Sequence, residues 1–477
     1  MDMRIVRQPL YVLLMLALFS FKCSKDDQPD TPVDVPVSDV QFYQTSADGS
    51  SLLQKQKQTL KFSNKTNQYP ILKVDSTQQF QELDGFGYSL TGGSAIVLNT
   101  LSASDRNKIL RELFSRDSSA LAISCLRISI GASDLDPAPF SYDDVPEGQT
   151  DINLEKFSIE PDRTNLIPVL KQILEINPEI MIMGSPWSAP PWMKTNKNFK
   201  GGSLKKEYFP VYARYFVKYI QAMKAEGINI HAITVQNEPL HPGNNPSMLM
   251  EAQDQRDFVR DYLGPAFENA GITTKIIIYD HNCDKPDYPI SILNDATAKK
   301  YIDGSAFHLY AGEISAMSNV HEAHPDRNLY FTEQWTGKNE SFASNFMWRT
   351  QHVVIGSLRN WSRMVLQWNL ANDPGFGPHT DGGCSECKGA LTIGGTITRN
   401  PSYYILGQIS AWVPPGSVRV ASDNLPGLQS VAFLTPTGRK VLLVLNTTQT
   451  NQSFNIEFKD RRVTTLLKAQ SAGTYIW

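Results

Sequence analysis

Charged residues are scarce in this 477-residue chain, at 19%, and they show no positive excess, since the formal net charge is −3. A nucleic-acid-binding surface needs a basic patch, so we expect no nucleic acid partner. Hydrophobic residues make up 41% of the chain, which excludes a largely disordered protein. Aromatic residues, at 10%, are numerous enough to fill a core and to leave rings for flat, hydroxyl-rich ligands. This composition favours a carbohydrate ligand.

Motifs of metal and serine enzymes are also missing from the sequence. The histidines form neither an HExxH motif nor the spacing of a 2-His-1-carboxylate site. No G-x-S-x-G elbow follows a predicted strand. We therefore expect no metal, no other cofactor and no serine nucleophile. The histidines considered are His241, His321, His324 and His352.

Long hydrophobic runs are rare, and the most pronounced one lies at the N-terminus. Arg4 and Arg7 precede the apolar residues 10–21. That run is shorter than the roughly 20 residues of a membrane-spanning helix and is typical of a secretory signal. We predict a signal peptide over residues 1–22, and therefore export.

Cys23 follows the signal and resembles the modified cysteine of a bacterial lipoprotein. This favours a lipid anchor in the outer membrane, at the cell surface or in the periplasm. Lys22 departs from the small residue usual before such a cysteine, so the alternative is a secretory signal with an incidental cysteine. Residues 26–40 are rich in Asp and Pro, and we predict a solvated tether over residues 23–50.

The other four cysteines are few enough to consider singly. Cys125 lies in an apolar stretch and is expected to be a buried, inert thiol, whereas the state of Cys283 stays open. Cys384 and Cys387 form a Cys-x-x-Cys within the glycine-rich residues 381–395. In an exported protein a local disulfide is favoured over a redox pair. A zinc site would need a second ligand pair at matching spacing, which is missing.

Short apolar runs alternate with amphipathic stretches over residues 81–400. Eight such runs, which we take to end in polar or aromatic residues, predict an α/β fold, a (β/α)8 TIM barrel whose active site lies at the C-terminal ends of the strands. The predicted strands are residues 85–88, 124–130, 180–184, 231–236, 275–280, 305–309, 328–332 and 363–368, and the predicted helices are residues 105–114, 165–176, 208–226, 254–269 and 342–359.

An appended antiparallel β-sandwich is predicted over residues 401–477, where a helix at residues 402–412 gives way to alternating runs. Residues 51–80 are expected to contribute N-terminal strands to the same sandwich. The predicted strands are residues 59–62 and 70–74 before the barrel, and residues 418–421, 428–434, 440–446, 453–458 and 464–468 after it.

Two of the predicted barrel strands lead into a glutamate. Glu238, between Asn237 and Pro239, follows the fourth strand, and Glu333 follows the seventh. Desolvating a carboxylate is costly unless a partner or a substrate compensates. Because parallel strands end at one rim of a barrel, we predict that the two side chains face each other. The alternative is that either glutamate is a surface residue or pairs with a nearby arginine.

A facing pair of carboxyls suits glycoside hydrolysis. Glu238 would donate the proton, with its pKa raised by burial and by the second carboxylate. Glu333 would be the nucleophile and would stay ionised. A separation of about 5–5.5 Å would make the reaction retaining, through a covalent glycosyl-enzyme intermediate.

Several further segments resemble glycoside hydrolase family 30, which includes glucosylceramidases, β-1,6-glucanases and xylanases. The resemblance covers residues 81–477 and implies a barrel with a side sandwich, with Glu238 as acid/base and Glu333 as nucleophile. The segments are Gly85-Phe86-Gly87, Arg127, the Ser-Pro-Trp…Lys-Thr-Asn stretch of residues 185–196, Gln236-Asn237-Glu238-Pro239, Phe307-His308-Leu309-Tyr310 and Thr332-Glu333.

The resemblance also implies a sugar site formed by Arg127, Trp187, Asn237, His308, Tyr310 and Trp368. Asn237 would bind the sugar 2-hydroxyl, and Arg127 would keep Glu333 ionised. His308 and Tyr310 would orient the nucleophile, and the two indoles would offer apolar faces to a pyranose. The alternative is an ion pair at the barrel bottom for the arginine and core packing for the tryptophans.

One departure bears on the substrate. Family glucosylceramidases place an aspartate after the threonine, whereas here Thr91 is followed by Gly92 and Gly93, which implies a changed first sugar subsite. Trp335 after the nucleophile would stack on a further glucose, and with the insertion at residues 382–389 it makes the chain more similar to the β-1,6-glucanase branch. We expect endo-hydrolysis of β-1,6-glucan. The alternatives are a glucosylceramidase, a xylanase or a non-catalytic surface glycan-binding lipoprotein.

Overall fold

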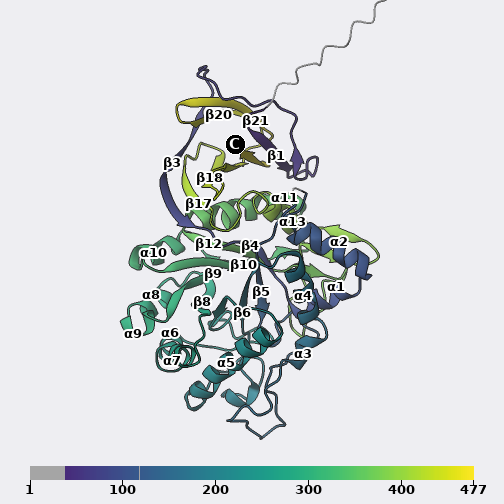
Figure 1. Cartoon of the computed structure of the whole chain (residues 1–477), viewed down its shortest axis with the longest axis vertical. Helices are drawn as coiled ribbons and strands as arrows, with labels where there is room; N and C mark the ends of the chain where they lie inside the picture. Colours follow the sequence, from purple (N-terminus) through teal and green to yellow (C-terminus); the bar gives the residue numbers. More distant parts are fainter. Residues whose placement is uncertain (1–37, 118) are drawn as a thin grey trace, which may run out of the picture. The chain divides into compact units, whose positions relative to one another are not determined.

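The computed structural model describes residues 38–117 and 119–477. The predicted signal peptide and Cys23 lie outside these residues. In the part of the chain that is described, no helix combines the length and the apolar character needed to cross a bilayer. The described residues form a barrel and a β-sandwich (Figure 1).

Eight parallel strands close into a barrel in the order β10-β12-β4-β5-β6-β7-β8-β9. Each strand pairs with the next one in the chain, and β12 closes the ring between β10 and β4. The predicted α/β barrel is therefore confirmed, and each of its eight strands overlaps a predicted one. The strands are β4 Gly85–Ser89, β5 Cys125–Ser129, β6 Met181–Ser185, β7 Ala232–Thr234, β8 Lys275–Cys283, β9 Ile302–Gly312, β10 Asn328–Glu333 and β12 Ser362–Gln367.

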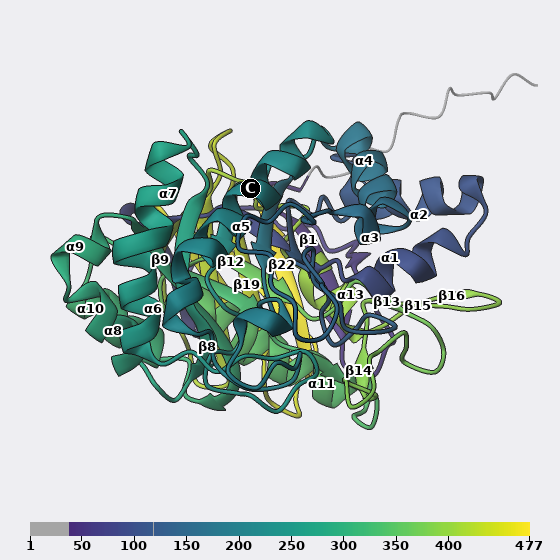
Figure 2. The same ribbon diagram turned by 90° about the horizontal axis from the view of Figure 1, so that it is seen from below.

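Helices lie around the outside of the strands (Figure 2). The helix α4 shows why, because its buried residues Leu166, Val169, Leu170 and Ile173 recur at helical spacing and form one apolar face. The helices are α1 Gly92–Asn99, α2 Ala103–Phe114, α3 Glu160–Arg163, α4 Leu166–Ile176, α5 Phe209–Ala225, α6 Ala252–Phe258, α7 Gly264–Asn269, α8 Asp287–Leu293, α9 Ala296–Lys299, α10 Ala316–Ala323, α11 Phe342–Arg349, α12 Ser357–Arg359 and α13 Pro401–Gly407.

Two of the predicted helices contain an irregularity that the sequence pattern did not indicate. Val259–Leu263 is a π-helical turn between α6 and α7, and Thr350–Gly356 is another between α11 and α12. The apolar face continues through both turns, since Val259, Leu263, Val353 and Val354 are buried. Hydrophobic periodicity locates a helix but does not report one extra residue in a turn.

The centre of the barrel is packed with side chains, so the rim has a solid floor. The residues are Cys125, Met183, Ala232, Ile277, Ala306, Tyr330, Met364 and Leu366. Cys125 is a free, buried thiol, as predicted, and burial raises its pKa. Cys283, whose state the sequence left open, is also free and buried.

The sandwich strands follow the order β2-β1-β22-β19-β18-β17-β3-β20-β21. The long strand β3 joins its two parts, because its first residues pair with β20 and its later residues pair with β17. The β3–β20 pairing is parallel, whereas the other pairings in the sandwich are antiparallel. The strands are β1 Gln41–Ser46, β2 Gln54–Lys55, β3 Ile71–Glu82, β17 Val418–Ser422, β18 Leu428–Leu434, β19 Lys440–Asn446, β20 Gln452–Phe458, β21 Arg461–Leu467 and β22 Ser471–Ile476.

Two predictions about the N-terminal segment are wrong. The tether does not extend to residue 50, because β1 pairs along its whole length with β22 and buries Phe42 against Tyr475, with ring centroids 4.4 Å apart. Residues 59–62 are not a strand, although Leu60 is buried and its carbonyl accepts hydrogen bonds from Asp39 and Val40. Burial of a few apolar residues mimicked a strand pattern there.

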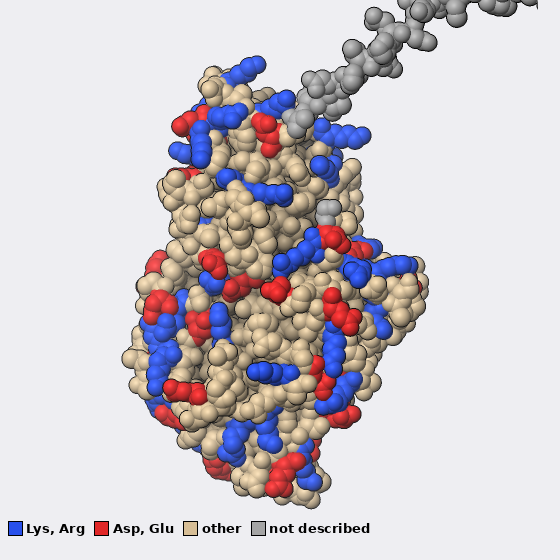
Figure 3. Space-filling model, viewed as in Figure 1, with Lys and Arg blue, Asp and Glu red and all other residues tan. Residues whose placement is uncertain are grey.

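Short strands and single turns complete the rim of the barrel. Strand β11 pairs with β14, and β13, β15 and β16 form a small sheet. On the face shown in Figure 3, Lys and Arg side chains are interspersed with Asp and Glu over the barrel. The short strands are β11 Thr336–Gly337, β13 Ala371–Asn372, β14 Cys387–Lys388, β15 Leu391–Ile393 and β16 Ile397–Arg399, and the 3-10 turns are Pro191–Met193 and Lys206–Tyr208.

Candidate active site

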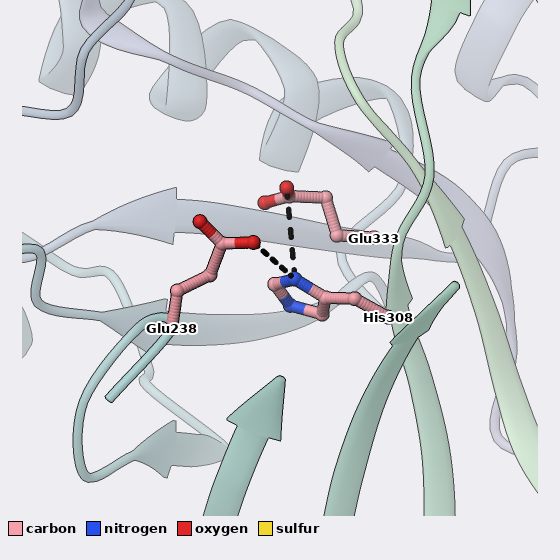
Figure 4. A group of neighbouring side chains, drawn as sticks. All are labelled: Glu238, His308 and Glu333. Atoms are coloured by element: carbon pink, nitrogen blue, oxygen red, sulfur yellow. Dashed lines mark hydrogen bonds and ion pairs between the residues drawn. The ribbon is translucent and has the colours of Figure 1, made fainter. Parts of the chain in front are cut away.

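The two predicted glutamates meet at the C-terminal rim of the barrel. Glu333 is the last residue of β10, and Glu238 lies four residues after the end of β7. One oxygen of each carboxyl and a ring nitrogen of His308 all lie within 4.8 Å of one another (Figure 4). The side chains of Glu238 and Glu333 are only 10% and 8% exposed. The predicted juxtaposition is therefore present.

Both oxygens of Glu333 accept a hydrogen bond. The Arg127 Nη1 atom donates to Oε2 over 2.7 Å, and the Tyr310 hydroxyl donates to Oε1 over 2.9 Å. This arrangement fixes the carboxyl plane, and a permanent cation at this distance favours the ionised form.

Arg127 lies at the rim of the barrel, not at its bottom. It is 1% exposed, and its guanidinium also donates to Asp280 Oδ2 over 2.8 Å, to Asn237 Oδ1 over 2.6 Å and to Ser185 Oγ over 3.1 Å. Because the amide oxygen of Asn237 accepts from the arginine, its NH₂ group is left to face the cavity. The predicted contact between Arg127 and Glu333 is present.

His308 lies between the carboxyls of Glu238 and Glu333 and also contacts a third carboxyl. Its Nδ1 atom lies 3.4 Å from Glu238 Oε1 and 3.7 Å from Glu333 Oε1 (Figure 4), and its Nε2 atom lies 3.0 Å from Asp280 Oδ1. Burial lowers the pKa of His308, but the surrounding carboxylates outweigh burial and raise it to about 9. The imidazole is therefore cationic at neutral pH.

Asp280 is the functional residue that sequence reasoning missed most clearly. It is fully buried near the end of β8, and it also accepts hydrogen bonds from Thr234 and Thr332. Burial alone would raise its pKa, but Arg127 and His308 lower it well below the ordinary range. The sequence did contain a signal, because Asp280 is the last residue of one predicted strand and Glu333 directly follows another.

The pKa of Glu238 differs from the prediction. Burial raises it, but the hydrogen bond and the charge of His308, with His281 and His241 nearby, bring it below the ordinary value. The prediction that the pKa of Glu238 is raised in the free site is therefore wrong. Sequence reasoning counted burial and the second carboxylate but not the buried imidazolium. Asn244 also donates to Glu238 Oε2 over 3.2 Å, which favours the ionised form.

The pKa of Glu333 is raised above the ordinary value. Burial is the largest cause, and Glu238 and Asp280 add to it, while His308 and Arg127 oppose it. The two carboxyls therefore compete for protons in the free site, and each titrates under the influence of the other.

The backbone next to the site adopts left-handed conformations at bulky residues. The φ angles are +46° at Glu238, +71° at Tyr279 and +63° at Asp280. Each costs on the order of 1–3 kcal/mol and persists only where surrounding contacts enforce it. One such contact is the hydrogen bond from the Glu238 amide to the Asp280 carbonyl. Two of the three carboxylates of the site, those of Glu238 and Asp280, are therefore carried by left-handed residues.

A cavity of about 290 Å³ opens above the carboxyls. Its size is close to the lower limit of ordinary small-ligand sites. Trp187, Trp335 and Trp368 all line it, and the rings of Trp187 and Trp368 have centroids 5.4 Å apart. The full lining is Asp134, Trp187, Asn237, Glu238, His241, Asn244, Asn282, Tyr310, Glu333, Trp335, Trp368, Cys384 and Cys387. Contact of these residues with a sugar remains a prediction.

The glycines after Thr91 do not line the cavity, and the subsite change inferred from them stays a prediction. A side chain at Gly92 would meet the Asp136 carboxylate at 1.7 Å, and the Gly93 amide donates to the Leu135 carbonyl. Asp134, in the loop after β5, supplies a carboxyl to the lining of the cavity. This residue is 5% exposed. Burial and the charge of Glu333 raise the pKa of Asp134 to about 7.

Cys384 and Cys387 form the predicted disulfide. Both residues line the cavity, and they pack with Leu135, Trp187 and Trp368 in one apolar cluster. The sequence indicated the bond but not its location against the tryptophans.

The donor atoms of Glu238, His308 and Glu333 are close enough together to suit a metal ion. The imidazole is the obstacle. Both ring nitrogens of His308 face carboxylates, and with its pKa raised to about 9 the imidazole carries a proton at neutral pH that a metal ion would have to displace. Hydrogen bonding accounts for the cluster.

Known proteins share both parts of this chain. Residues 83–413 match the Glycosyl hydrolase family 30 TIM-barrel domain, and residues 416–475 match the family 30 beta sandwich domain. An endo-1,6-beta-D-glucanase of Trichoderma harzianum is 36% identical over 405 residues, which cover 79% of this chain and 80% of the relative. A lysosomal acid glucosylceramidase of Mus musculus is 29% identical over 441 residues, covering 87% and 85% respectively. A solved endo-beta1,6-glucanase is 34% identical, with a TM-score of 0.85 and coverage of 92% of this chain and 99% of that one.

Protonated His308 should stabilise the folded protein. Because its pKa is raised from 6.5 to about 9, its contribution is complete below about pH 6.5 and is lost as the pH rises through about 9. Between these values we expect the free energy of unfolding in urea to fall by about 3 kcal/mol more in the wild type than in His308→Gln.

His352→Gln is the matched control, since burial lowers the pKa of that histidine and it gains no charge on folding. Its pH dependence should follow the wild type. Equal slopes for the wild type and His308→Gln would contradict a charged imidazole.

Proposed function

Because this chain belongs to glycosyl hydrolase family 30, we propose that it cleaves internal linkages of β-1,6-glucan with retention of anomeric configuration. The observation that carries the hydrolytic part is the approach of Glu238, Glu333 and His308 within 4.8 Å. This spacing is shorter than the roughly 6.5–9.5 Å between the carboxyls of inverting enzymes and is closer to the roughly 5–5.5 Å of retaining ones.

In the first step Glu333 attacks the anomeric carbon while Glu238 protonates the departing oxygen. Arg127 and Tyr310 hold the Glu333 carboxylate in place through its two oxygens. Glu238 must carry a proton at this point. A sugar over the pair excludes the remaining water from Glu238, and this desolvation raises its pKa above that of the free site. Asn237 presents its NH₂ group to the sugar 2-hydroxyl, where the bond strengthens as positive charge develops.

In the second step Glu238 acts as base. It takes a proton from a water molecule, which attacks the anomeric carbon and releases Glu333. The imidazolium of His308 stabilises whichever carboxyl is ionised, because its Nδ1 atom lies within 4 Å of both. The net proton balance of the cycle is zero.

The linkage specificity rests on similarity together with the aromatic lining. The similarity to relatives described as endo-1,6-beta-glucanases extends over four-fifths or more of the length of each relative. Trp335 borders the cavity beside Trp368, with which it pairs through the backbone, and can stack on a second glucose. A glucosylceramidase activity is the second candidate, supported by the 29% identity to the mouse enzyme.

A substrate panel tests the linkage. We expect the purified protein to release a ladder of oligosaccharides from the β-1,6-glucan pustulan, with little action on xylan or glucosylceramide. Proton NMR of early products should show the β-anomer first, because a double displacement retains configuration. Release of glucose alone would contradict endo action, and preferential cleavage of glucosylceramide would favour the second candidate.

The nucleophile assignment is tested by Glu333→Gln, which keeps the shape of the side chain but removes its charge. We expect kcat to fall by more than about a thousandfold with folding retained. Glu313→Gln, which makes the same change at an exposed glutamate, is the matched control.

A chemical rescue distinguishes the two glutamates. Azide should restore cleavage of an activated aryl glycoside by Glu333→Ala and give the α-glycosyl azide, because azide then attacks from the vacated side. With Glu238→Ala the product should be the β-glycosyl azide. Retention of most activity by Glu333→Gln would reject the assignment.

We also propose export and anchoring to the outer membrane through Cys23, on the basis of the signal-like residues before it. Cys23→Ser should move the protein from the detergent-rich phase to the aqueous phase in a detergent partition of cells. Ser24→Ala, which keeps the cysteine, should partition like the wild type. An unchanged partition of Cys23→Ser would contradict a lipid on this residue.

A further inference from the structure

One loop meets the segments that follow four different barrel strands. We call residues 380–388 the disulfide loop. Its contacts are Thr380 and Cys384 with Asp134 after β5, Asp381 with Asn245 after β7, Lys388 with Thr336 after β10, and Cys387 with Asn372 after β12. A loop with these partners bridges the mouth of the barrel.

The contact with Asp134 is especially close. The Cys384 amide donates to Asp134 Oδ2 over 3.2 Å, and the Thr380 amide donates to the Asp134 carbonyl over 2.9 Å. Gly383 makes the approach possible, because a Cβ there would lie 2.4 Å from that carbonyl. The loop therefore sets the orientation of a buried carboxyl that lines the cavity.

The disulfide faces the same cavity as the catalytic pair. Both cysteines line it, Cys387 is 5% exposed, and Cys384 is half-buried. The bond belongs to the apolar cluster that includes Trp187 and Trp368, with Trp335 packed against it. A stabilising crosslink could lie anywhere on the surface, whereas this one is part of the wall that a bound sugar would meet.

We propose that the Cys384–Cys387 disulfide is a substrate-binding wall of the cavity, which contacts the bound glycan and holds the Cys384 amide on Asp134. Its sulfurs add apolar surface beside the indoles for the C–H face of a pyranose, and the crosslink keeps the turn narrow. Without the bond, each cysteine side chain is free to rotate into the cavity. The proposal rests on the proposed glycan hydrolysis but not on one linkage.

The test compares steady-state kinetics of the wild type and the double variant Cys384→Ser/Cys387→Ser. The substrate is whichever of pustulan, xylan or glucosylceramide the wild type cleaves. We expect KM to rise about tenfold with kcat changed less than about threefold, since ground-state contacts are lost while Glu238 and Glu333 stay in place. Ser385→Ala, at an exposed position between the two cysteines, should leave both constants unchanged.

A purely structural crosslink would give a different result. Loss of folded enzyme lowers the apparent kcat at constant KM, because fewer molecules are active. Urea unfolding of each variant and titration of active sites measure that fraction.

Reduction of the wild type is the second measurement and needs no substitution. A phosphine reductant under native conditions should raise KM as the double variant does, and reoxidation should restore it. Cys125 and Cys283 are free and buried, and Cys23 contributes equally before and after reduction, so the increase in the thiol count on reduction reports on the loop. An unchanged KM with the bond verifiably open would overturn the proposal. Failure of the wild type to cleave pustulan would instead reject the proposed linkage.

Discussion

The buried guanidinium of Arg127 lies among two carboxylates and an amide at the barrel mouth, and the placement of the proposed catalytic groups depends on it. It contacts Glu333 and Asp280 at 2.7 and 2.8 Å, and Asp280 in turn holds His308. A buried charge is tolerated only where partners compensate it, so each of these charged groups depends on the others. The third carboxyl, Glu238, is positioned by the imidazole that this network keeps protonated.

Much of the architecture could be predicted because it follows from local pattern. Each barrel strand was an apolar run ending in polar residues, and the two glutamates were recognisable by position alone. The N-terminal strand β1 was missed, since it follows directly on a Pro- and Asp-rich segment, and the last strand, β22, was missed because Ser471–Ile476 is dominated by small residues. Neither segment shows its pairing partner in its own sequence.

The electrostatics of the site could not be predicted in the same way. The pKa of Glu238 depends on an imidazole from β9, which is itself controlled by Asp280 from β8. Similarly, the sequence at Gly92 indicated that a carboxyl of the sugar site was missing. In the structure the space beside Gly92 is filled by the carboxylate of Asp136, which lies in another loop. Such effects come from residues that are distant in sequence, and they appear only when the strands are placed side by side.

The order of strands in the sandwich has a consequence for how the chain is made. β1 and β3 are synthesised before the barrel, but their neighbours β22 and β17 come after it. The emerging chain must therefore leave β3 unpaired, and β1 with only the short β2 beside it, until the barrel residues have been made, which exposes edges that invite aggregation. Only the final residues supply the strand that lies between β1 and β19, so a ribosome that stops a few codons early leaves the sandwich open.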